Sequence, residues 1–147
     1  MYFEQFYKGQ SFVSAPYRIT KEEIVEYAVR YDPQYIHVDE VRAKESVFGG
    51  IIAAGFHTAS IAIRLLVDLG CFGDEIICGV GVDDVKFLLP VYPDDILTAR
   101  IQVLEMADHH KANNKGFVTF GIELFNQNEQ KVLSFKSKAL FKKQVTA

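Results

Sequence analysis

The sequence lacks the excess of positive charge that proteins binding polyanions usually carry. It has 16 Lys and Arg residues against 19 Asp and Glu, a formal net charge of −3 at pH 7 with neutral histidines. Nucleic-acid-binding domains normally show a basic patch or a high isoelectric point. No basic run, zinc-finger spacing or RNA-binding aromatic motif occurs here, so nucleic acid is excluded as the expected partner.

Cysteine is scarce, and no apolar run is long enough to span a membrane. Cys71 and Cys78 do not form a Cys-x-x-Cys motif, so we expect reduced, at least half-buried thiols rather than a disulfide framework. The longest apolar stretch is interrupted by Arg64 and Asp68, and it falls short of a membrane span. The N-terminal residues show no signal-peptide pattern. We therefore expect a cytoplasmic protein that does not enter a membrane.

The sequence does contain the residue balance of an ordinary globular domain, with 49% hydrophobic and 24% charged residues. A chain of 147 residues is long enough to bury roughly 70% of the surface of its unfolded state. No repeat or low-complexity segment divides it. We expect one domain over residues 1–147.

The first predicted helix has a well-marked start and end. Residues 20–23 (TKEE) form a capping box, and Ile19 and Ile24 occupy the positions of a hydrophobic staple around it. The helix should cover residues 21–31, because Pro33 disfavours a helical conformation at Asp32.

Two further helices are predicted downstream. Residues 38–47 are polar and indicate a short helix. Residues 53–69 are apolar on almost every side, which predicts a long helix that begins near Gly55 and is buried all round. Gly70 should end it as a C-terminal cap.

Strand-like segments make up most of the remaining chain. Pro16 interrupts a strand over residues 11–19 and favours an edge position, because proline donates no ladder hydrogen bond. In a later strand the apolar phase slips at residues 83–84, which predicts a β-bulge. A long helix with a mostly antiparallel sheet is an α+β arrangement. The later strands are expected over residues 76–89, 96–106, 117–125 and 132–141.

The residues that can do chemistry concentrate in residues 31–60. Asp32 precedes His37 by five positions, and a Phe-Gly-Gly turn at residues 48–50 leads to the helix that begins near Gly55. A carboxylate and an imidazole near a helix start can carry out acid/base chemistry on a polarised carbonyl. The alternative interpretation is structural, with Asp32 capping the next turn and His37 packed in a loop.

This stretch resembles the signature of the MaoC-like, (R)-specific enoyl-CoA hydratase family, roughly Gly-Asp-x-Asn-Pro-x-His-x-Asp followed by Phe-Gly and an Ala-His-Gly step. A second block, residues 85–95 (VKFLLPVYPDD), is similar to the family's segment of strand, proline turn and aspartate. The matching positions in the first block are Asp32, His37, Asp39, Ala43, Phe48, Gly49, Ala53 and Gly55. The departures are Tyr31, Gln34, Tyr35 and Ala54, in place of Gly, Asn, Pro and His.

The resemblance implies the hot-dog fold, a curved, mostly antiparallel sheet wrapped around a long central helix, and a homodimer or higher homo-oligomer. It also implies a hydro-lyase of fatty acid metabolism, an (R)-specific enoyl-thioester hydratase or 3-hydroxyacyl-thioester dehydratase. The substrate would be a trans-2-enoyl-CoA or acyl-carrier-protein thioester. Asp32 and His37 would hold the catalytic water, Gly55 would bind the thioester carbonyl through its amide, and Gln34 would support the pair. Neither a cofactor nor a metal is implied.

Two other functions stay open. The first is a hot-dog acyl-CoA thioesterase, in which a carboxylate drives water onto the carbonyl carbon, although the Asp-x4-His spacing favours the hydratase. The second is a non-catalytic acyl-thioester-binding subunit, which the four departures from the signature allow.

The remaining polar residues are given structural interpretations. Asp39 is expected to cap a helix, because no further ligands stand at metal-binding spacing around it. We expect His57 to be a hydrogen-bonded core or interface histidine. The His109-His110 pair should be solvated, and Asp94-Asp95 should close a turn.

Overall fold

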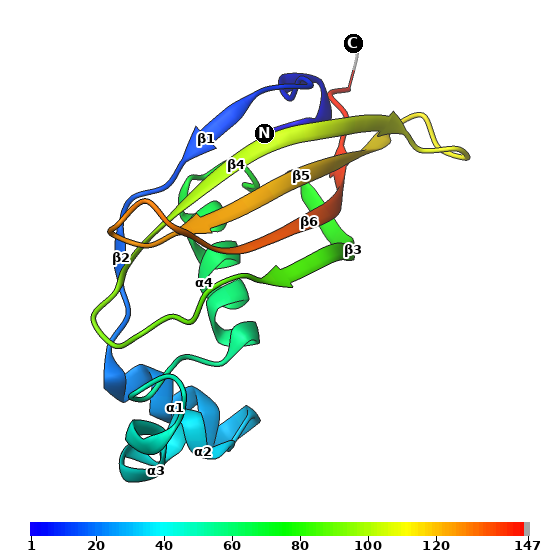
Figure 1. Cartoon of the computed structure of the whole chain (residues 1–147). Helices are drawn as coiled ribbons and strands as arrows, with labels where there is room; N and C mark the ends of the chain where they lie inside the picture. Colours follow the sequence, from blue (N-terminus) through cyan, green and yellow to red (C-terminus); the bar gives the residue numbers. More distant parts are fainter. Residues whose placement is uncertain (146–147) are drawn as a thin grey trace.

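The computed structural model describes residues 1–145, which form a curved antiparallel sheet with helix α4 on its concave side (Figure 1). Helices α1, α2 and α3 gather at the N-terminal end of α4. The helices are η1 (Phe3–Gln5), α1 (Lys21–Tyr31), α2 (Tyr35–Val38), α3 (Glu40–Glu45) and α4 (Gly55–Asp68). The strands are β1 (Ser11–Val13), β2 (Tyr17–Arg18), β3 (Ile76–Phe87), β4 (Ile96–Asp108), β5 (Lys115–Phe125) and β6 (Lys131–Lys142).

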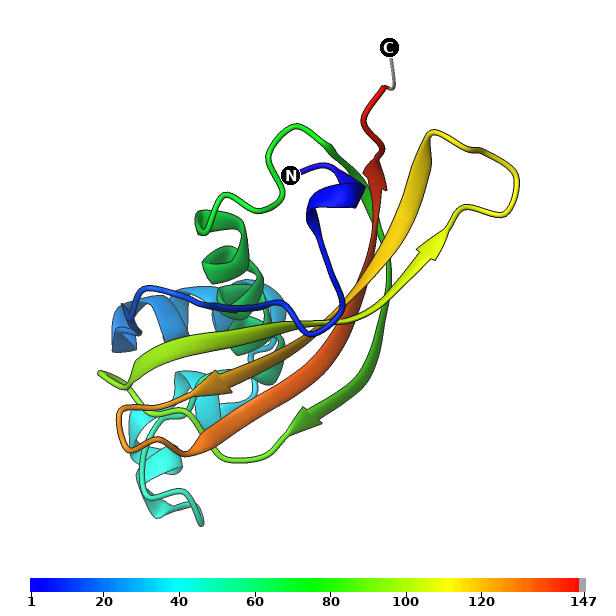
Figure 2. The same ribbon diagram turned by 90° about the horizontal axis from the view of Figure 1, so that it is seen from above.

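The strands form one sheet in the order β1-β4-β5-β6-β3, and β2 also pairs with β4. All of these pairings are antiparallel. Figure 2 shows the long strands sweeping in an arc around α4. The architecture is the predicted α+β hot-dog fold, and the interrupted first strand lies at an edge, as Pro16 indicated.

The core lies between α4 and the concave face of the sheet. Along β5 the burial alternates strictly, which places one face of the strand against the helix. The inward side chains Val118, Phe120, Ile122 and Leu124 are at most 1% exposed. Full burial of each such side chain stabilises the fold by about 1.5–3 kcal/mol, so this face anchors α4 against the sheet.

The start of α1 is formed by the predicted capping box. The Thr20 hydroxyl accepts a hydrogen bond from the Glu23 amide (3.2 Å), and the Glu23 carboxylate accepts one from the Thr20 amide (3.0 Å). Ile19 and Ile24 are both fully buried around the cap. The helix ends at Tyr31, as predicted, and this fixes the position of the residue that follows it.

The predicted short helix over residues 38–47 is wrong in its bounds. The chain forms two short helices instead, α2 and α3, and α2 carries His37. Asp39 separates them and caps α3, because its carboxylate accepts a hydrogen bond from the Arg42 amide (3.0 Å). The role of Asp39 as a helix cap was predicted. Helix α2 was not predicted, because its single turn is too short to produce a periodic apolar pattern.

The expectation that α4 is buried all round is also wrong. The helix starts at Gly55 and is followed by Gly70 with φ of +78°, as predicted. Phe56 and Val67, however, are 68% and 46% exposed. The physical reason is that the sheet covers only one side of α4, mainly through β4 and β5.

Strand β3 lies at the free edge of the sheet, and its register shifts between Asp83 and Lys86, where a bulge was predicted. Cys71 is buried, whereas Cys78 on β3 is exposed, so the expectation of two at least half-buried thiols holds only for Cys71. No helix within residues 1–145 is both long and apolar enough to cross a membrane.

Candidate active site

The structure brings Asp32 and His37 together. Asp32 directly follows the last residue of α1. The chain changes direction at Pro33, and α2 then places His37 beside Asp32. His37 Nε2 lies 3.6 Å from Asp32 Oδ2. His37 is 5% exposed, while a third of the Asp32 side chain remains accessible (34%). The His37 imidazole is thus buried, whereas the Asp32 carboxylate is partly accessible to solvent.

A backbone contact sets the tautomer of the neutral His37 ring. Its Nδ1 atom lies 2.6 Å from the carbonyl oxygen of Ile52. A carbonyl oxygen can only accept a hydrogen bond, so Nδ1 carries the hydrogen in the neutral ring. The lone pair of neutral His37 is therefore on Nε2, the atom that faces Asp32, and this is the arrangement of a base.

Gln34 lies beside this pair. Its Nε2 donates a hydrogen bond of 2.7 Å to Asp32 Oδ1. The other carboxylate oxygen, Oδ2, is the one nearest His37. One oxygen is thus occupied by the amide, and the second remains available as an acceptor.

Gly55 is the first residue of α4 and lies at the positive end of its helix dipole. The amides of His57 and Thr58 both donate to the Ala54 carbonyl. Within the described chain this leaves the amides of Gly55 and Phe56 as free donors, since the first N–H groups of a helix have no intrahelical partner. These donors can receive a carbonyl oxygen.

Gly55 also meets a steric requirement. A Cβ atom at this position would lie 2.5 Å from Cε1 of Phe87, closer than real contacts allow. Because Gly55 has no side chain, the Phe87 ring can pack against it and a ligand can also approach its backbone closely. Gly55 therefore allows tight packing against Phe87 in addition to any role in binding.

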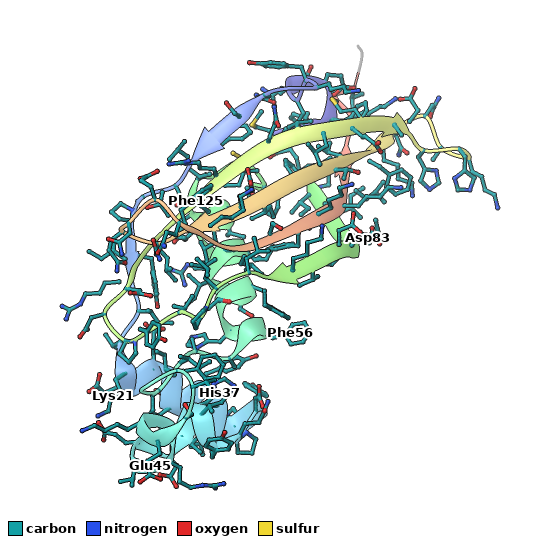
Figure 3. All side chains as sticks on the ribbon, in the orientation of Figure 1. Lys21, His37, Glu45, Phe56, Asp83 and Phe125 are labelled. Carbon is teal, nitrogen blue, oxygen red and sulfur yellow. The ribbon has the colours of Figure 1, made fainter. Side chains whose placement is uncertain are left out.

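The described site opens into a cavity of about 500 Å³, a volume in the range of small-molecule sites. Figure 3 shows His37 in the helical cluster below the first turn of α4, from which Phe56 projects. A larger hollow, of about 620 Å³, lies across the sheet strands and contains neither member of the acid/base pair. The cavity of about 500 Å³ is lined by the polar residues Asp32, Gln34, His37 and Thr58, by Gly55, and by the apolar residues Phe48, Ile52, Ala53, Phe56, Phe87, Leu88, Leu89, Pro90, Val91 and Val132.

His57 does not line this cavity. It is 6% exposed, as expected of a core histidine, and its ring stacks on Tyr27 at 4.5 Å. Its Nε2 lies 3.5 Å from Glu23 Oε2, whereas Nδ1 has no partner among the described residues. Burial lowers the pKa of His57. The same oxygen, Glu23 Oε2, accepts a hydrogen bond of 2.7 Å from the Tyr17 hydroxyl, and burial together with this hydrogen bond raises the pKa of Tyr17 to about 12.

The other polar residues have structural environments. Asp95 is buried and accepts hydrogen bonds from the Tyr92 amide and the Gln127 side chain, both at 2.9 Å, so it closes the predicted turn. His109 and His110 lie in the β4–β5 loop, where they stack on each other. Within residues 1–145, no group of three or more His, Cys, Asp or Glu side chains could hold a metal ion.

Comparison with known proteins places this geometry in a family. A sequence profile described as the MaoC like domain matches residues 5–122. The chain belongs to the MaoC-like family. Uncharacterized protein YdeM of Bacillus subtilis is 37% identical over 143 residues, which are 97% of this chain and 100% of that protein.

Solved structures agree with this placement. A MaoC-like dehydratase from Rhodospirillum rubrum has a TM-score of 0.90 and 31% identity, with 99% of each chain covered. An (R)-hydratase from A. caviae involved in PHA biosynthesis has a TM-score of 0.74 and 23% identity, with coverage of 96% of this chain and 99% of that one. The second likeness is one of fold.

Two features of this MaoC-like site were missed in the sequence. One is the Ile52 carbonyl that holds His37, because a backbone acceptor leaves no mark in the residue type. The other is Phe87 above Gly55. Phe87 belongs to the second family-like block, residues 85–95. The presence of this block was the one sequence signal that Phe87 could lie near the site.

Proposed function

We propose that this MaoC-like protein is an (R)-specific enoyl-thioester hydratase, or a 3-hydroxyacyl-thioester dehydratase in the reverse direction. One observation carries the proposal. The free Nε2 of His37 and an oxygen of Asp32 lie 3.6 Å apart at the polar end of a cavity that also contains the start of α4. A base, an acceptor and carbonyl-directed amides are the groups that addition of water to an enoyl thioester requires.

In the hydration direction, the attacking water donates one hydrogen bond to His37 Nε2 and one to the Asp32 carboxylate. A position about 2.8 Å from both atoms exists at their observed separation. As the water oxygen bonds to the β-carbon, its proton moves to Nε2, and the electrons of the double bond move to the thioester oxygen. The imidazolium then delivers a proton to the α-carbon on the same side, which makes the addition syn and restores neutral His37.

The free amides at the start of α4 stabilise the enolate. Negative charge develops on the thioester oxygen during the addition, and the Gly55 amide at the positive end of the helix is positioned to receive it. Gln34 holds the other oxygen of Asp32 and so keeps the carboxylate turned toward the water. The apolar remainder of the cavity takes the acyl chain of a CoA or acyl-carrier-protein thioester.

The proposed assembly is a homodimer joined at β3. This strand ends the sheet, and the exposed fractions of its side chains Ile77, Val80, Val82 and Phe87 lie between 44% and 56%. A long apolar edge strand has unpaired backbone N–H and C=O groups that can hydrogen-bond to a strand of another chain. Pairing with β3 of a second copy about a two-fold axis covers both edges at once.

The experiment that tests the activity uses crotonyl-CoA. Hydration removes the enoyl absorbance while the thiol stays esterified, and chiral chromatography should give (R)-3-hydroxybutyryl-CoA. Release of free thiol without prior loss of the enoyl group would instead establish a thioesterase. Retained binding of acyl-CoA with neither reaction would establish a non-catalytic binding subunit.

A further inference from the structure

A second, smaller cavity adjoins the site at the first turn of α4. It is a groove of about 320 Å³ between α4 and β3, lined by Ala59 and Ile63 of the helix and by Val82 and Val85 of the strand, among others. Of the described residues, Phe56 alone lines both this groove and the cavity that contains Asp32 and His37. The two spaces therefore meet at one side chain.

Phe56 lies between the catalytic cavity and the groove. Its ring packs edge-on against Phe87 with the centroids 5.8 Å apart and an interplanar angle of 75°. Phe87 in turn covers Gly55 at the start of the helix. The Phe56 side chain is 68% exposed and projects away from the body of α4 (Figure 3), so the core does not fix its position.

The chemistry of the groove selects its occupant. Its lining is apolar except for Ser60, and the Ser60 hydroxyl already donates to the Phe56 carbonyl at 2.8 Å. No charged side chain lines it. Such a surface gains free energy by covering hydrocarbon, and it offers a polar ligand few partners.

We propose that Phe56 limits the length of the acyl chain that the site accepts. The inference rests on the proposed function, because the enoyl group must lie at Asp32 and His37 for its tail to reach Phe56. A short chain ends before the ring, and a longer chain has to displace the Phe56–Phe87 pair before it enters the groove. Phe56 is thus a specificity-determining residue.

The test compares crotonyl-CoA with trans-2-decenoyl-CoA in wild type and in Phe56→Ala. The ratio of kcat/KM for the long over the short substrate should rise about tenfold or more in the variant, since even one methylene in an apolar pocket changes discrimination by roughly that factor. Adding Ala59→Phe to Phe56→Ala refills the groove and should reverse the gain. Phe125→Ala is the matched control, because the Phe125 ring packs on Arg100, away from both cavities, and it should leave the ratio unchanged.

Binding separates failure of this inference from failure of the proposed activity. Kd is measured for butyryl-CoA and decanoyl-CoA, whose saturated chains cannot be hydrated. If no variant turns over but Phe56→Ala tightens decanoyl-CoA relative to butyryl-CoA, the hydratase proposal fails and the role of Phe56 stands. If the ratio does not change, a second copy of the chain or another element fills the groove, and the inference is overturned. Absence of acyl-CoA binding would overturn it as well.

Discussion

His37 is held by Ile52 through one ring nitrogen and faces Asp32 through the other. The Nδ1 atom lies 2.6 Å from the Ile52 carbonyl oxygen, and Nε2 lies 3.6 Å from the carboxylate. The first contact sets the tautomer, and the second places the free lone pair where a water can bridge both groups. A buried ring with a defined lone pair, next to a partly accessible carboxylate, is suited to take a proton from a water that bridges the two groups.

Removing either member of this pair should abolish most of the hydration activity. We expect Asp32→Asn and His37→Gln each to lower kcat for crotonyl-CoA by about 10²–10⁴-fold, because each loses a group that transfers the proton or orients the water. Circular dichroism should remain that of the wild type. Asp68→Asn and His110→Gln are matched controls on exposed positions and should keep full activity. Near-normal kcat in either site variant would remove the proposed mechanism.

A methyl group on Gly55 should impair the site by moving Phe87. The added Cβ would meet the Phe87 ring at 2.5 Å, and Phe87 is half exposed, so the ring can shift into the cavity without unfolding the protein. We expect Gly55→Ala to lower kcat/KM for crotonyl-CoA by about tenfold or more, since misplacement at a reacting centre is costly. The double variant Gly55→Ala/Phe87→Ala should recover part of the loss. If it recovers none, the methyl group itself blocks the thioester.

His57 should make stability depend on pH. Burial lowers the pKa of His57 below its usual 6.5, so in acid the unfolded chain binds a proton that the folded chain binds less readily. Stability should therefore fall as the pH drops below about 6.5 toward the pKa of the folded state. Urea unfolding in mildly acidic and neutral buffer measures this difference. In His57→Asn the free energy of unfolding should differ less between the two buffers. If it differs as much as in the wild type, other groups cause the acid sensitivity.

The edge of β3 should hold two copies together. Sedimentation velocity should give a dimer for the wild type. Val80→Lys should shift it to monomer, because a charge on the paired edge opposes strand addition. Val29→Lys changes another exposed valine, on α1 (64% exposed against 47% for Val80), and should leave the dimer intact. A wild-type protein that sediments as a monomer would contradict the proposed assembly.

Much of the fold could be predicted because local signals specify it. The Thr20–Glu23 capping box, the alternation along β5 and the slip of phase at Asp83 each depend on neighbours in the sequence, and each appears in the structure. The helix end before Pro33 was a local signal, whereas a shared site for Asp32 and His37 was expected only from the family resemblance; the structure places the two side chains 3.6 Å apart. What could not be predicted depends on contacts between distant segments. The exposure of Phe56 results from where the sheet stops, and the position of Phe87 above Gly55 results from the path of β3.

The most direct test of the account follows the oxygen atom of the water. Crotonyl-CoA is incubated with the protein in water enriched in a heavy oxygen isotope, and the products are analysed by mass spectrometry. The wild-type protein should place one heavy oxygen in the hydroxyl group on the β-carbon of an intact 3-hydroxybutyryl-CoA, and the His37→Gln variant should do so about 10²–10⁴-fold more slowly. Heavy oxygen in a released carboxylic acid, or no incorporation with the wild-type protein, would contradict the account.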